Sequence, residues 1–94
     1  MTKLAPTLPR GEANGLDALT ADLTDRPADA HLVIALIDCK KISTDVDTGD
    51  VEPTARILRI EAVLPADQGR ARVMMATAFE NRTGKKTLPG VEPR

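Results

Sequence analysis

The hydrophobic pattern changes its period once between His31 and Arg82, and this change restricts the chain to a mixed fold of strands and helix. Residues 31–38 form an apolar run rich in β-branched side chains, which is typical of a strand covered on both faces, so we predict the central strand here. Residues 54–64 alternate instead, with Arg59 and Glu61 pointing away from Leu58 and Ile60. This second segment predicts a strand with one face on a core and the other toward water or a partner.

The segment between these two strands, residues 44–51, carries turn-forming residues. Gly49 can adopt a positive φ without penalty, and the aspartates beside it favour turns. We therefore expect a β-hairpin that reverses near Asp47 to Asp50. Because Pro53 cannot donate to a strand ladder, it indicates an edge position, a bulge or a start of regular pairing at Thr54.

Helical spacing appears on both sides of the hairpin. A stripe with the period of an amphipathic helix begins after Asp67, which can cap the helix, and ends before Gly84, which can close it. The members of this stripe are Ala71, Met74, Met75, Ala78 and Phe79. Leu16, Leu19 and Leu23 recur at similar spacing and allow a short helix before Pro27.

These elements predict an α+β fold in which an antiparallel hairpin is followed by one amphipathic helix (ββα), with a short N-terminal helix as an addition. We expect a flexible arm at 1–14, a single domain at 15–86 and a flexible tail at 87–94. We expect Met74, Met75 and Phe79 to pack the helix against the sheet. Because a hairpin with one helix has only marginal stability alone, we also expect a two-fold homodimer that joins the sheets or packs the helices together. The competing account is a monomer in which the N-terminal segment supplies a further element.

Composition restricts the setting and the partners. Cys39 is the single cysteine, which excludes an intramolecular disulfide and favours a reducing compartment. No signal peptide or membrane span is recognisable in the sequence. We therefore expect a cytoplasmic protein. Residues 1–54 carry five basic and ten acidic side chains, whereas residues 55–94 carry eight and four. This asymmetry could orient a homodimer or steer a charged partner.

No constellation in the sequence predicts catalysis or a cofactor. The acidic loop offers oxygen ligands for Ca²⁺ or Mg²⁺ through Asp45, Asp47, Asp50 and Glu52. In a calcium-binding loop, however, the glycine would have a different position relative to the acidic residues, and a bidentate glutamate would follow. We therefore interpret these residues as a solvated hairpin tip. His31 and Cys39 lie about 26 Å apart along one strand, too far for a nucleophile and its base, so we interpret Cys39 as a small buried apolar residue. The 84–87 segment follows a helix and lacks the upstream glycine of a phosphate-binding loop.

Two surfaces remain as candidates for binding. The outward side of the second strand predicts a protein contact through Ile57, Arg59, Glu61 and Val63. Basic residues at the helix and its end could contact phosphates, although no free aromatic is left for stacking on bases; we assign this role to Arg70, Arg72, Lys85 and Lys86. Solvated charge at a helix end, where cations suit the helix dipole, is the simpler explanation for them.

Two stretches carry a resemblance to a known group of proteins. They are Glu52–Glu61 (EPTARILRIE), preceded by Asp45–Gly49 (DVDTG), and Glu80–Pro89 (ENRTGKKTLP). Together they resemble small uncharacterised proteins encoded by bacteriophages of actinobacteria, and the likeness covers about residues 31–89. It implies a phage origin and a host cytoplasmic setting, and it supplies no catalytic or ligand residues.

The leading functional hypothesis is therefore a non-enzymatic phage accessory protein that binds protein, either a second copy of itself or a host factor. The alternative is a nucleic-acid-associated factor of phage replication or transcription, and a structural component of the virion is a third, weaker hypothesis.

Overall fold

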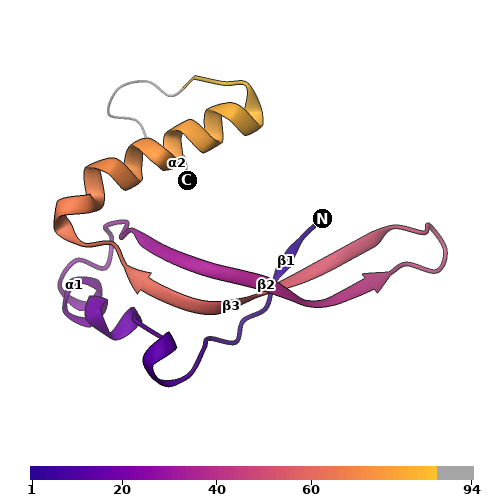
Figure 1. Cartoon of the computed structure of the whole chain (residues 1–94), viewed down its shortest axis with the longest axis horizontal. Coiled ribbons are helices and arrows are strands. Elements are labelled where there is room, and N and C mark those ends of the chain that lie inside the picture. The colour runs from indigo at the N-terminus through magenta and orange to yellow at the C-terminus, as the bar shows by residue number, and fades with distance from the viewer. Residues whose placement is uncertain (87–94) are drawn as a thin grey trace. The chain divides into compact units, whose positions relative to one another are not determined.

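The computed structural model describes residues 1–86 of the chain, which divides into two compact units, Met1–Ala62 and a second unit that begins at Val63. Each unit is described by itself. The first holds a three-stranded sheet with short helical turns, and the second holds the long helix α2 (Figure 1). The α+β class is confirmed, but the sheet has three strands where the expected ββα arrangement has two.

The sheet contains β1 (Lys3–Leu4), β2 (Val33–Thr44) and β3 (Val51–Ala62) in the order β1-β3-β2. Strands β2 and β3 form a long antiparallel hairpin, as the sequence predicted (Figure 1). The central strand is β3, so the prediction of a central strand at 31–38 is wrong. The apolar run lies instead in an edge strand, whose side chains are mostly exposed.

The hairpin turn is built by local hydrogen bonds around Asp45. Its Oδ1 accepts from the backbone N–H groups of Asp47 (2.8 Å) and Thr48 (3.1 Å), and the N–H of Gly49 donates to its carbonyl oxygen at 2.8 Å. Gly49 has a φ of 77°, a conformation that side-chain-bearing residues rarely adopt. The predicted reversal near Asp47 to Asp50 is thereby confirmed.

The N-terminal segment is part of the sheet rather than an arm outside the domain. Strand β1 runs parallel to β3, and the N–H of Ala5 donates to the carbonyl oxygen of Ala55 at 2.8 Å. Farther along, the N–H of Gly15 donates to the carbonyl oxygen of Ile60 at 2.7 Å. The segment lies here because the second edge of β3 has backbone groups that need partners. The N-terminal segment thus supplies a further element to the sheet, as the alternative to the homodimer assumed.

Gly15 is the point where this segment approaches β3 most tightly. A Cβ at this position would lie 2.7 Å from the carbonyl oxygen of Ile60, so glycine is needed for the close approach. A short helical turn precedes Gly15, η1 (Gly11–Ala13), and two follow it, η2 (Leu16–Leu19) and α1 (Thr20–Asp25). The expected short helix before Pro27 is thus present. The buried apolar residues of the described chain are Ala5, Leu19 and Ile60.

The second unit begins with the turn η3 (Pro65–Asp67), and α2 spans Gln68–Thr83. Gly84 closes the helix at a φ of 73°, and its N–H donates to the carbonyl oxygen of Glu80 at 2.8 Å, as predicted. Asp67 is the N-cap residue, as predicted, but its carboxylate makes no capping hydrogen bond and instead accepts from Arg70 Nη2 at 2.6 Å.

The apolar stripe of α2 is largely open to solvent. Met74 and Met75 are 65% and 45% exposed, and Phe79 is half-buried. Within the second unit, these three side chains therefore close no core. The tail predicted at 87–94 lies outside the described residues.

Candidate interaction surfaces

The register of the hairpin determines which side chains share a face of the sheet. Directly opposed residues of an antiparallel pair point to the same side. Leu36 lies opposite Arg59, while Ile37 lies opposite Ile57, so Leu58 is an extra residue on β3 that forms a bulge. A second irregularity leaves Lys40 as an extra residue on β2, between Cys39 and Lys41.

The Leu58 bulge divides the protein-contact surface that the sequence predicted. Because Leu36 and Ile37 are neighbours in a strand, they point to opposite faces, and so do their partners Arg59 and Ile57. Glu61 pairs with Ile34 and shares the face of Arg59. Val63 follows β3 and begins the second unit. The four predicted residues therefore do not form one surface, because the bulge reverses the alternation on which the prediction depended.

The most extensive apolar exposure of the sheet lies on β2, which has β3 as its one neighbour among the described strands. We call residues 33–37 the β2 edge segment. Ile34 and Leu36, on one face, are 63% and 62% exposed, and Val33 and Ile37, on the other, are 39% and 55% exposed. The apolar run is visible in the sequence, but apolar residues at alternate and adjacent positions fit a covered central strand and an exposed edge strand equally well. The sequence pattern alone therefore does not reveal this exposure.

An ion pair joins the two long strands next to this segment. Arg56 Nε donates to Asp38 Oδ1 at 2.7 Å, and Nη2 donates to Oδ2 at 3.0 Å, in a bidentate pair. The hydrogen bond from Arg56 lowers the pKa of Asp38, and the same pair raises the pKa of Arg56.

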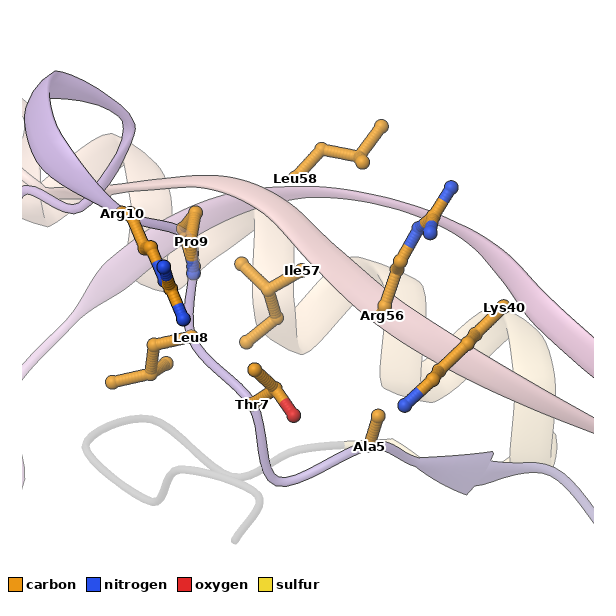
Figure 2. A pocket seen from close by; sticks show the side chains of 9 residues that line it. All are labelled: Ala5, Thr7, Leu8, Pro9, Arg10, Lys40, Arg56, Ile57 and Leu58. Atoms are coloured by element: carbon orange, nitrogen blue, oxygen red, sulfur yellow. The ribbon is translucent and has the colours of Figure 1, made fainter.

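A groove of about 360 Å³ lies between the N-terminal segment and the middle of the hairpin (Figure 2). Its apolar lining comes from Ala5, Leu8, Pro9, Ile57 and Leu58, and its polar lining comes from Thr7, Arg10, Lys40 and Arg56. Figure 2 shows Ile57 and Thr7 between Arg10 and Lys40, whereas Arg56 and Leu58 extend to the other side of β3. Sequence reasoning missed this groove, because it depends on the position of the N-terminal segment.

Two carboxylates of the acidic loop already bind groups of the same chain. Asp45 Oδ1 accepts two backbone N–H groups of the turn, and Glu52 forms an ion pair with Lys3 Nζ at 2.9 Å, which lowers the pKa of Glu52. Within residues 1–86, no group of three or more side chains of the metal-ligating types is arranged to hold an ion.

The predicted phosphate-contacting residues all lie in the second unit. Arg70 is paired with Asp67, and Arg72 also has an interaction partner. Lys85 and Lys86 follow the helix end and are exposed. Arg82 lies over the ring of Phe79, 5.6 Å from its centroid. Part of this basic set is therefore already occupied by intramolecular contacts.

His31 and Cys39 have separate local partners. His31 Nε2 is 3.2 Å from the carbonyl oxygen of Arg26, and Cys39 Sγ donates to the carbonyl oxygen of Lys41 at 3.2 Å. Cys39 is exposed, so the expectation that it is buried is wrong, because its strand lies at the sheet edge.

None of the described helices has both the length and the apolar character needed to cross a bilayer. Comparison of the chain with protein-family models, with curated proteins and with solved structures gives no match.

Proposed function

We propose that this protein acts by binding protein, and that its primary partner is a second copy of itself, paired through the β2 edge segment. The observation that carries the proposal is the exposure of apolar side chains on both faces of an edge strand. Natural proteins protect such edges with charges, prolines, bulges or very short strands. Residues 33–37 contain no charge and no proline, and no extra residue lies on β2 between them.

A two-fold antiparallel arrangement centred on Ala35 suits this segment. It places Ile34 opposite Leu36 of the second copy, and Val33 opposite Ile37 of the second copy. Each pair joins side chains that already share a face, so apolar residues meet apolar residues on both sides of the joined sheet. An isologous contact of this kind closes on itself and does not propagate into a filament.

The biological setting that we propose is that of a phage accessory protein in the host cytoplasm, without an enzymatic activity of its own. This setting is supported by the sequence resemblance described above, and the charge asymmetry between the two parts of the chain supports a binding role. A host factor is the second protein partner that the hypothesis includes.

The test replaces one apolar side chain of the edge segment by lysine, a residue that blocks edge pairing. Ile34→Lys and Leu36→Lys alter exposed positions, so the fold should be retained, as circular dichroism can check. We expect a dimer for the natural chain and a monomer for both variants in sedimentation velocity at micromolar concentration.

Ile42→Lys is the matched control. Ile42 is 66% exposed on the same strand but lies beyond the Lys40 irregularity, outside the proposed contact. This variant should remain dimeric. A natural chain that is monomeric at every concentration, or folded Ile34→Lys and Leu36→Lys variants that stay dimeric, would overturn the proposal.

Nucleic-acid binding through Arg70, Arg72, Lys85 and Lys86 is the less favoured function, since two of the four have intramolecular partners. It predicts retention of DNA or RNA on a filter at low salt and loss of this retention as salt rises.

A further inference from the structure

We propose that the groove between the N-terminal segment and the hairpin is a binding site for a small apolar molecule that carries a carboxylate group. This site lies on residues that the β2 edge pairing does not use, so the inference goes beyond the proposed function and stands independently of it.

The first argument is the composition of the lining. Ligand sites are mostly apolar concavities of about 300–1,000 Å³ with a few polar groups that orient the ligand. The groove, with about 360 Å³, lies at the small end of this range, and five of its nine lining residues are apolar. Its capacity therefore suits a small molecule with a short apolar body.

The second argument is charge. Among the described residues, three cationic residues and no carboxylate line the groove, although the chain as a whole has a net charge of −1. Asp38 neutralises Arg56, which turns away from the apolar lining (Figure 2). Arg10 and Lys40 remain on either side of Ile57 and Thr7, and a negatively charged head group complements them.

The third argument is the position of the two bulges. Lys40 is the extra residue on β2 and lines the groove, and Leu58, the extra residue on β3, borders it with its side chain turned to the other side of the strand. Bulges redirect side chains and are common next to functional sites. Here the two irregularities of one hairpin border the same cavity.

The test uses octanoate as the probe, with octanol and octylammonium as matched ligands that have no charge and the opposite charge. Amide signals of the full-length ¹⁵N-labelled protein report where each probe binds. We expect octanoate to give saturable shifts at Thr7 and Ile57, with weaker effects from octanol and none from octylammonium.

Two substitutions separate the contribution of charge from that of shape. Arg10→Gln and Lys40→Gln should each weaken octanoate binding about threefold, the effect expected for one exposed ion pair, and leave octanol binding unchanged. The Ile34→Lys variant should bind octanoate as the natural chain does, which separates this result from the outcome for self-association.

Three outcomes would overturn the inference. They are the absence of saturable shifts, equal binding of octylammonium, and shifts confined to other parts of the chain. A blocked peptide with glutamate next to leucine provides the last comparison. If this peptide shifts Thr7 and Ile57 while octanoate does not, the groove binds acidic peptide and the small-molecule proposal is wrong.

Discussion

Asp38 shows how a single side chain can set the pH dependence of this fold. The hydrogen bond from Arg56 lowers its pKa in the folded chain, and Lys3 does the same for Glu52. A carboxylate whose folded pKa is lowered contributes stability above its unfolded pKa and loses that contribution as pH falls through the folded value. Both ion pairs therefore support the fold at neutral pH, and their contribution declines as pH falls from the ordinary carboxylate range, about 4, to the lowered folded pKa values.

We predict that Asp38→Asn makes stability less sensitive to acid. The natural chain should lose more of its urea midpoint between pH 6 and pH 3 than the variant does, because the variant has no carboxylate at this position to protonate. Asp47→Asn, at the exposed hairpin turn, is the control and should keep the natural acid profile. Equal acid sensitivity of Asp38→Asn and the natural chain would show that the Arg56 pair does not contribute.

At the scale of the element, two glycines at the ends of α2 have opposite roles. Gly69 lies in the first turn and Gly84 closes the helix, and an added Cβ would meet no neighbouring atom at either position. Their backbones differ, however, because Gly84 has a φ of 73°. The effect of alanine at each position is therefore decided by backbone conformation alone.

Gly69→Ala should stabilise the helix by up to about 1 kcal/mol, since alanine has the higher helix propensity. Gly84→Ala should destabilise it by about 1 kcal/mol, because alanine is strained in the left-handed conformation. Far-ultraviolet circular dichroism during urea unfolding measures both changes. Similar effects of the two substitutions would contradict the different roles assigned to them.

The same contrast between local and distant causes explains which elements the sequence could predict. The hairpin turn, the end of α2 and the short N-terminal helix depend on nearby residues such as Gly49 and Gly84, and they were predicted. Strand β1 has two residues and no periodicity, so the sequence contains no local signal for it. Its pairing with β3 makes β3 the central strand and leaves β2, predicted to be central, at the edge.

The candidate sites depend on the same distant effects. The Leu58 bulge has no visible signature in the alternating pattern, yet it moves Ile57 to the face opposite Arg59 and divides the predicted contact surface. The groove needs both this bulge and the N-terminal segment. Sequence reasoning could therefore supply the apolar run of β2 but could not determine its exposure or detect the groove.

At the scale of the whole molecule, few side chains are buried, so binding a second copy would add a large share of the free energy of unfolding. Ala5, Leu19 and Ile60 are the buried apolar residues of the described part of the chain, and large apolar side chains of β2 remain exposed. Any partner that binds only the folded chain shifts unfolding to harsher conditions by mass action. If the edge segment pairs two copies, folding and dimerisation are linked.

We therefore predict that the thermal midpoint of the natural chain rises with protein concentration. For a chain that is fully dimeric, a hundredfold increase contributes about 2.7 kcal/mol per dimer, because unfolding releases two chains. The Leu36→Lys variant should have a midpoint that is independent of concentration, and Ile42→Lys should behave like the natural chain. Differential scanning calorimetry over this concentration range makes the comparison. A constant midpoint for the natural chain would show that the fold is stable without its second copy and would contradict the link between folding and dimerisation.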